Sequence, residues 1–164
     1  MKYNSEKEMY PQVALWLVTY LKHKYPQALI NAYDTSRENL SDFLRRHKLN
    51  NYFSEAETYV IKVDVTGVIK HKEKCSLAFV ECKLKPITLK DISQLIGYSK
   101  VVLPAFSIIV SPGGISSPVN KLINLYRRYD ILNYRNSQKI RIASWNQTTG
   151  DIETATLLPH GEHL

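Results

Sequence analysis

The sequence predicts an α/β protein in which a central mixed β-sheet is flanked by helices. Amphipathic helical patterns alternate along the chain with short, β-branched strand patterns. The resulting order is helix, strands, helix, strand, helix, strands, which favours helices packed on a sheet. Of the 164 residues, 44% are hydrophobic, which is enough for a core, and this length suits a single domain over residues 1–164.

The N-terminal segment is expected to form a helix over residues 5–24. Its apolar side chains recur at helical spacing, as Met9, Val13, Trp16, Leu17 and Tyr20. Pro11 stands near the start, where a missing N–H is tolerated. A short extended piece, ALINAY, follows Pro26.

A second, shorter helix is expected within residues 34–56, a candidate helical insertion. Thr35 lies three positions before Glu38, which is the spacing of a capping box. The apolar side of this helix consists of Leu40, Phe43 and Leu44. Its basic end contains Arg45 and Arg46, which suit the helix dipole as solvated charges or, alternatively, contact nucleic acid.

Two apolar runs in the middle of the chain predict a β-hairpin. TYVIKVDVTGVIK (58–70) and CSLAFVECKL (75–84) alternate in polarity, and the short turn HKEK joins them. Pro86 then ends the second strand. Thr88 and Asp91 have the spacing of another capping box, which opens a helix over residues 89–102. The buried face of that helix is expected to contain Ile92, Leu95, Ile96 and Val102.

The last third of the chain completes the α/β pattern. AFSIIVSP (105–112) predicts a buried strand, and SPVNKLINLYRRYDIL (117–132) predicts a final amphipathic helix. KIRIASWN (139–146) and IETATLL (152–158) predict a closing hairpin around the turn QTTGD.

The overall composition limits the partners and the location. The formal net charge of +7, from 22 basic and 15 acidic residues, favours phosphate polymers as partners. The sequence contains no long uninterrupted apolar run and no secretory signal pattern, which predicts an intracellular, cytoplasmic protein without a membrane partner. Cys75 and Cys82 fit reduced thiols better than a disulfide framework.

Charged residues interrupt the otherwise apolar hairpin. Because strand side chains alternate, one face is expected to carry Leu77, Phe79, Glu81 and Lys83. The other face is expected to carry Ala78, Val80, Cys82 and Leu84. Asp64 lies between Val63 and Val65 on the preceding run. Buried charges are costly unless they are paired or bound to a metal, so these residues predict a polar site.

Asp64 and Glu81 supply the oxygen ligands that Mg²⁺ prefers, and Lys83 adds a compact positive charge suited to a phosphate or to a water molecule. These are the components needed for phosphodiester hydrolysis. The alternative is an ordinary salt bridge at a strand end, with the ammonium group of Lys83 extending to water.

The hairpin also resembles a known family. VDVTGVI, a turn, LAFVECK and a following helix are similar to the motif of the PD-(D/E)XK nuclease superfamily, which has the restriction-endonuclease-like fold. QLIGY, with Gln94 and Tyr98, resembles the QxxxY element of one branch. The resemblance covers roughly residues 5–111 and is strongest over 60–98. Val63 occupies a position at which some members have proline.

The resemblance implies a role for each matching residue. Asp64 and Glu81 would bind Mg²⁺ or Mn²⁺ together with the backbone carbonyl of Cys82, and Lys83 would orient or activate the attacking water. Gln94 would orient the site or contact the phosphate, and Tyr98 would contact nucleic acid or pack in the core. Glu6, on the first helix, would hold the metal indirectly or bind a second metal, with Glu8 as the less well-phased alternative. Glu6 also fits an ordinary first-turn glutamate that the helix dipole favours.

These inferences lead to one preferred function and two alternatives. The preferred function is a Mg²⁺-dependent nuclease with a restriction-endonuclease-like core, acting on DNA in preference to RNA. A homodimer or partner subunit is expected if both strands of a duplex are cut. Arg127 and Arg128 are further candidates for contact with a phosphate backbone or, alternatively, belong to a solvated helix face. The alternatives are a non-catalytic nucleic-acid-binding module and an α/β domain with an incidental salt bridge.

Overall fold

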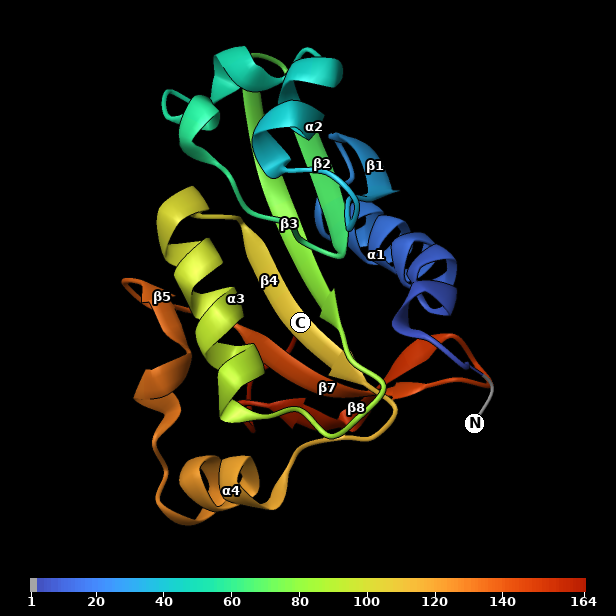
Figure 1. The fold of residues 1–164 in the computed structure, drawn as a ribbon, viewed down its shortest axis with the longest axis vertical. Helices are drawn as coiled ribbons and strands as arrows, with labels where there is room; N and C mark the ends of the chain where they lie inside the picture. Colours follow the sequence, from blue (N-terminus) through green and yellow to red (C-terminus); the bar gives the residue numbers. More distant parts are fainter. Residues whose placement is uncertain (1–2) are drawn as a thin grey trace.

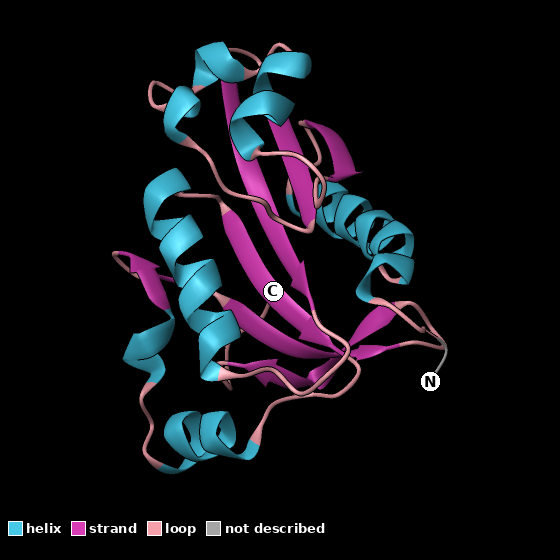
Figure 2. Cartoon of the chain, in the orientation of Figure 1, coloured by secondary structure: helices cyan, strands magenta, loops and turns pink. Residues whose placement is uncertain are grey.

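A six-stranded mixed β-sheet forms the centre of the protein in the computed structural model, which describes residues 3–164 (Figures 1 and 2). Its strands follow the spatial order β1-β2-β3-β4-β7-β8. They are β1 (Leu29–Asp34), β2 (Val65–His71), β3 (Lys74–Cys82), β4 (Phe106–Ser111), β7 (Arg141–Asn146) and β8 (Asp151–Leu158). The three central strands β3, β4 and β7 are parallel, whereas the outer pairings are antiparallel. This sheet, with helices on both faces, confirms the predicted α/β class with a central mixed sheet flanked by helices.

Helices cover the two faces of the sheet unequally (Figure 1). The long helix α1 (Tyr10–Lys24) packs on one face, with Val13, Leu17 and Leu21 buried against it. Helices α2 (Leu40–Arg46) and α3 (Leu89–Val102) share the core of the other face. The remaining elements are 3₁₀ helices at Glu6–Glu8, Asn50–Tyr52, Ala56–Thr58 and Tyr129–Leu132, α4 (Ser117–Asn120), a π-helical turn at Lys121–Leu125, and the small hairpin of β5 (Asn133–Arg135) and β6 (Gln138–Lys139).

The β2–β3 hairpin has the predicted alternation of side chains. Val65 pairs with Val80, and the register continues to His71 opposite Lys74. Leu77 and Phe79 belong to the core on the α2 and α3 side. The core on the α1 side takes Ala78, Val80 and Cys82. The face predicted for Glu81 is therefore the α3 face.

Helix α3 begins where the capping box predicted. The Thr88 backbone N–H donates to Asp91 Oδ2 at 2.8 Å, and the Asp91 N–H donates to Thr88 Oγ1 at 3.4 Å. These bonds satisfy two N–H groups that have no partner within the helix. The helix ends at Val102, and the next residue, Leu103, has a left-handed φ of 55°. The predicted bounds of 89–102 are confirmed.

The predicted strand over 58–70 begins later than expected. Strand β2 starts at Val65, and Asp64 immediately precedes it. The carbonyl groups of Ile61 and Tyr59 instead accept from the N–H groups of Leu40 and Ser41, at 2.8 and 3.0 Å. This β-branched stretch is a loop because its backbone satisfies the free N–H groups at the start of α2.

The capping box predicted at Thr35 is wrong. The buried Thr35 hydroxyl donates to the Val63 carbonyl at 2.6 Å and lies 2.8 Å from the Thr66 hydroxyl. Helix α2 starts only at Leu40, so Thr35 instead joins β1 to the segment before β2.

Three other predicted bounds also differ. The helix predicted over 5–24 is divided into a 3₁₀ turn and α1. The helix predicted over 117–132 stops after Leu125, and Arg127 has a left-handed φ of 55°. The strand predicted from 139 starts at Arg141, because Lys139 pairs with Asn133 in the β5–β6 hairpin. Within residues 3–164, no helix has the length and apolar character needed to cross a membrane.

Candidate functional site

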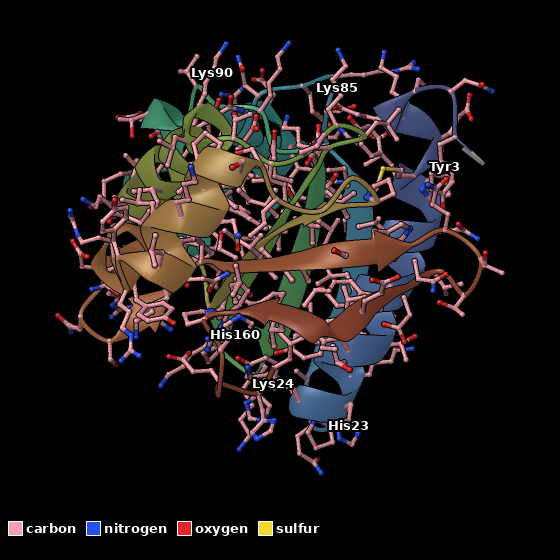
Figure 3. The ribbon with its side chains drawn as sticks, turned by 90° about the horizontal axis from the view of Figure 1, so that it is seen from below. Tyr3, His23, Lys24, Lys85, Lys90 and His160 are labelled. Carbon is pink, nitrogen blue, oxygen red and sulfur yellow. The ribbon has the colours of Figure 1, made fainter. Side chains whose placement is uncertain are left out.

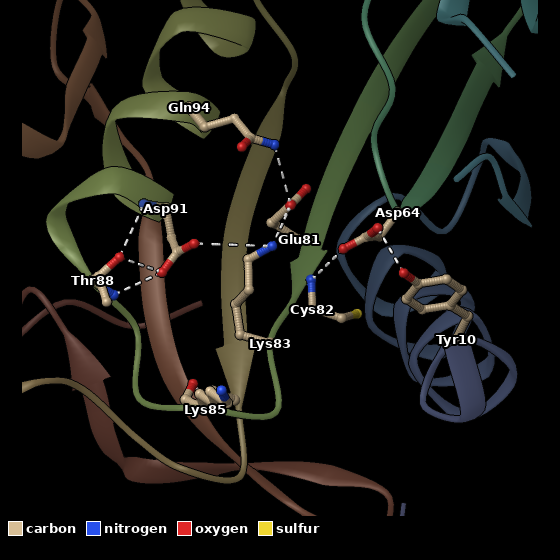
Figure 4. Close-up of polar contacts among 10 residues, drawn as sticks. Tyr10, Asp64, Glu81, Cys82, Lys83, Lys85, Thr88, Asp91 and Gln94 are labelled. Atoms are coloured by element: carbon tan, nitrogen blue, oxygen red, sulfur yellow. Dashed lines mark hydrogen bonds and ion pairs between the residues drawn. The ribbon is translucent and has the colours of Figure 1, made fainter. Parts of the chain in front are cut away.

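Asp64, Glu81 and Lys83, the charged residues that interrupt the apolar part of the hairpin, lie at its open end (Figure 4). Asp64 lies just before β2, while Glu81 and Lys83 lie at the end of β3 and directly after it. Because β2 and β3 are antiparallel, the start of one strand is beside the end of the other. Gln94 on α3 and Tyr10 on α1 reach this end from the two faces of the sheet.

Asp64 is held by one donor on each carboxylate oxygen. The Tyr10 hydroxyl donates to Oδ1 at 2.8 Å, and the Cys82 backbone N–H donates to Oδ2 at 2.9 Å. Burial raises the pKa of Asp64 above its ordinary value, and the two hydrogen bonds only partly oppose that effect. The carboxylate is therefore well oriented but incompletely neutralised.

Glu81 is the most deeply buried acidic residue of the site, with 4% of its surface exposed. Its Oε1 accepts from Lys83 Nζ at 2.9 Å and from Gln94 Nε2 at 3.4 Å. Its Oε2 is buried and has no hydrogen-bond partner within residues 3–164. Burial, followed by the negative charge of Asp64, raises the pKa of Glu81 to about 7.

Lys83 lies between two acidic residues. Its Nζ is 2.9 Å from Glu81 Oε1 and 4.0 Å from Asp91 Oδ1, and 19% of the side chain is exposed. Burial alone would lower the pKa of Lys83, but the charge and hydrogen bond of Glu81 outweigh burial and raise it. Lys83 is therefore a fixed positive charge rather than a proton acceptor at neutral pH.

Glu6 and Tyr98 lie at the margin of the site. Glu6 is partly buried, and its negative charge contributes to raising the pKa of Tyr10, Glu81 and Lys83. Glu8 is exposed and instead accepts from the Asn4 backbone N–H at 2.9 Å. Glu6 is thus the acidic residue that is electrostatically coupled to the site.

Tyr98 extends from the same helix as Gln94 and is partly buried against the core. Burial, followed by the negative charge of Glu81, raises the pKa of its hydroxyl. A hydrogen bond with Gln94 acts in the opposite direction. Tyr98 therefore interacts electrostatically with the charged residues of the site and also packs against the core.

The four arginines considered for nucleic acid have no polar contact with the site in the part of the chain that the structure describes. Arg45 pairs with Asp42, and Arg46 pairs with Glu38. Arg128 makes two 2.8 Å hydrogen bonds to Asp130. Arg127 is exposed on the irregular segment after α4.

Two residues of the site were not predicted from the sequence. A tyrosine on an apolar helix face is indistinguishable from core packing, so Tyr10 carries no sequence signal of its own. Asp91 was recognised as a helix cap, but its distance of 4.0 Å from Lys83 depends on how α3 packs against the sheet.

The donor set fits a hard cation. Mg²⁺ is often bound by one or two carboxylates and keeps several waters. The site has two carboxylates with raised pKa values and an unpartnered buried oxygen on Glu81. The Cys82 N–H donates to Asp64. Because the N–H and the carbonyl of a strand residue point to the same side, the Cys82 carbonyl is expected on the Asp64 side as a third oxygen donor. This set has only two side-chain donors, Asp64 and Glu81: among residues 3–164, no group of three or more His, Cys, Asp or Glu side chains is arranged to hold a metal ion.

A scan against protein-family models gives no match for this chain, and a search of curated proteins gives none either. The chemical interpretation therefore depends on the residues of the site and on their geometry.

Proposed function

We propose that this protein is a metal-dependent nuclease that hydrolyses phosphodiester bonds, with DNA as the preferred substrate. One observation carries the proposal. Two buried carboxylates, Asp64 and Glu81, lie with the protonated Lys83 at one end of a hairpin, and nearby positive charge only partly balances their negative charge. A Lys83–Glu81 salt bridge that served only the fold would not need Asp64 beside it, because the negative charge of Asp64 raises the pKa of Glu81 and so weakens the pair.

Asp64, Glu81 and the Cys82 carbonyl would hold Mg²⁺ or Mn²⁺, which would polarise a phosphate oxygen and lower the pKa of a bound water. Lys83 would place its positive charge where negative charge develops on the phosphate. Gln94 donates to Glu81 and keeps that carboxylate oriented. Tyr98, beside Gln94, would contact the nucleic acid, and Glu6 would act on the metal through an intervening water.

The net charge of +7 supports a polyanionic substrate. A homodimer or a partner subunit would be needed if the enzyme cuts both strands of a duplex, since one site cleaves one strand at a time. A restriction-endonuclease-like core is part of this proposal and agrees with a mixed sheet that carries the acidic residues on its antiparallel hairpin.

The test is a cleavage assay with labelled single-stranded, duplex and branched DNA and with RNA, in the presence of Mg²⁺, Mn²⁺ or EDTA. Glu81→Gln and Lys83→Ala should abolish cleavage, because one removes a ligand charge and the other removes the fixed cation. Lys85→Ala is the matched control, since Lys85 is an exposed lysine two residues farther along. It should retain activity.

Binding of Mn²⁺, measured by calorimetry, separates the nuclease from a non-catalytic nucleic-acid-binding module. The nuclease should bind Mn²⁺ and lose that binding in Glu81→Gln. Folded wild-type protein that binds DNA equally with and without metal and cleaves nothing would contradict the nuclease and favour the binding module.

A further inference from the structure

A second group of charged residues lies at the opposite end of the parallel strands from Asp64 and Glu81. It surrounds a cavity of about 140 Å³ near Phe106, the first residue of β4, and Arg141, the first residue of β7. We call it the basic pocket and define it by Tyr20, Lys24, Phe106, Tyr134, Lys139 and Arg141. In Figure 3, Lys24 lies at the opposite side of the molecule from Lys85, which follows the candidate active site.

Lys24 contributes a positive charge without a carboxylate partner in the described chain. Its Nζ donates to the Tyr20 hydroxyl at 2.9 Å and lies 5.4 and 5.7 Å from the ring centroids of Tyr20 and Phe106. The Tyr20 hydroxyl accepts from Lys24, so its own proton is left to donate. The aromatic rings thus hold the ammonium group at the mouth of the cavity.

A carboxylate from the C-terminal segment already lies against the other two cations. Glu162 Oε1 is 3.4 Å from Lys139 Nζ, and Glu162 Oε2 accepts a hydrogen bond from Arg141 Nη1. Partial burial would raise the pKa of Glu162, but Arg141 and Lys139 outweigh burial and hold it below its usual value. The pocket therefore presents donors in an arrangement that accepts an oxyanion.

The partly buried aromatic walls of the pocket reduce solvent screening of these charges. Burial raises the pKa of both Tyr20 and Tyr134 to about 12, although the positive charge of Arg141 acts to lower each of them. The positive charge of Arg141 therefore lies close enough to interact with the hydroxyl groups of both Tyr20 and Tyr134. Both hydroxyls stay protonated at neutral pH, and a partly desolvated site of this kind weakens electrostatic interactions less than water does.

We propose that the basic pocket binds a phosphoryl group, with Glu162 as an internal substitute that the ligand displaces. Lys139 and Arg141 pair with Glu162, while Lys24 lines the same cavity without a carboxylate partner in the described chain, so a dianion would match the three cations better than Glu162 does. Guanidinium groups bind phosphate through paired hydrogen bonds. A cavity of about 140 Å³ is smaller than the usual range for whole small-molecule ligands, which favours one phosphoryl group over a complete nucleotide.

Gln138 adds a polar atom for the same ligand. It lines the cavity, and its Oε1 is buried without a hydrogen-bond partner in residues 3–164. The monohydrogen phosphate dianion keeps one hydroxyl, which can donate a hydrogen bond to this oxygen. The proposal does not depend on nuclease activity, because none of these residues belongs to the candidate active site.

The test is titration of the full chain with inorganic phosphate, thymidine 5′-monophosphate, and one oligonucleotide with and without a 5′-phosphate. Binding is followed by calorimetry and by amide NMR shifts in β6 and β7, in EDTA so that no metal-dependent binding contributes. Preference for the phosphorylated oligonucleotide over its unphosphorylated form would identify a strand terminus as the source. Binding of only phosphate or the monophosphate would identify a free small anion.

Glu162→Gln should bind phosphate about tenfold tighter than wild type, the scale of one charge-assisted hydrogen bond released from competition. Glu153→Gln, an equal change of charge at an exposed position of β8, should have no effect. Lys24→Met should weaken binding several-fold, and Lys22→Met, exposed on the same last turn of α1, should not. Absence of phosphate binding in both wild type and Glu162→Gln, or binding that neither pocket variant changes, would overturn the proposal.

Discussion

At the scale of single residues, Asp64 shows how a distant side chain determines the orientation of a functional group. Its Oδ1 accepts from Tyr10, which is 54 positions away and 4% exposed, and its Oδ2 accepts from a backbone N–H. Each carboxylate oxygen can accept a second interaction, so these bonds orient Asp64 without blocking a metal. Tyr10 is therefore a positioning residue in the proposed site.

Tyr10→Phe should lower the affinity for Mn²⁺ by about tenfold, since loss of a hydrogen bond to a metal ligand typically has an effect of 10–100-fold. Calorimetric titration with Mn²⁺ measures this effect. Tyr20→Phe, the same change on the same helix but remote from Asp64, is the control. Equal metal affinity in the two variants would show that the Tyr10 bond serves only the fold.

His47 is a second residue whose surroundings give a measurable consequence. Its ring lies 4.5 Å from the Tyr33 ring centroid and 4.6 Å from that of Phe43. Burial, followed by the charge of Arg46, lowers the pKa of His47 below its ordinary value of 6.5. The folded state therefore favours the neutral ring. The resulting stabilisation is complete above the unfolded-state pKa and is lost as the pH falls through the folded-state pKa.

His47→Gln should lose less stability than wild type between pH 8 and pH 5, the range in which histidine changes its charge. Urea unfolding at several pH values measures the slope. His23→Gln, at an exposed position of α1, should keep the wild-type slope. Parallel curves for wild type and His47→Gln would contradict the prediction.

At the scale of elements, local signals fix helix starts only where no tertiary partner competes for the capping side chain. Thr88 and Asp91 bond each other, and α3 begins as predicted. Thr35 and Glu38 have the same spacing, but Thr35 is buried against Val63 and Glu38 pairs with an arginine. The sequence contains both motifs but not the packing that distinguishes them.

Thr88→Ala should reduce the free energy of unfolding by about 1 kcal/mol, the usual cost of removing an N-terminal cap. Thr88→Ser keeps a hydroxyl at that position and should retain most of the stability. Urea unfolding of the three proteins measures the difference. Serine and alanine variants of equal stability would show that the capping bond contributes nothing.

At the scale of the whole molecule, close packing of α1 on the sheet depends on a glycine in β2. A Cβ added at Gly67 would lie 2.9 Å from Leu21 Cδ1, 3.0 Å from Leu17 Cδ2 and 3.2 Å from Ala78 Cβ. By contrast, a Cβ at Gly97 on α3 would meet nothing within 4 Å. A side chain is therefore excluded by close packing at Gly67 but has room at Gly97.

Gly67→Ala should destabilise the protein by about 1–3 kcal/mol, because the added methyl group overpacks the interface between α1 and β2. Gly97→Ala should stabilise it by about 0.5–1 kcal/mol, because alanine is the better helix former and loses less backbone entropy. Urea unfolding gives the sign of each change. Changes of the same sign would refute this account of the packing.

The sequence predicted the parts of this molecule that depend on local pattern. Alternation along the hairpin grouped Glu81 with Leu77 and Phe79, because period-two order is a property of the strand itself. The loop at 59–63 and the break after Leu125 were missed, because β-branched or amphipathic composition does not reveal where the backbone finds its partners. The contact between Tyr10 and Asp64 joins two elements across the sheet and has no local signature.

The β2–β3 hairpin carries the candidate site at its open end and the two-residue turn Lys72–Glu73 at its closed end. Seven residue pairs separate the two ends, a span of roughly 20 Å at the rise of an antiparallel strand. The chain can therefore lengthen at this turn without moving Asp64, Glu81 or Lys83. The turn is therefore a suitable place to attach a reporter, because a label there lies one hairpin length from the candidate site.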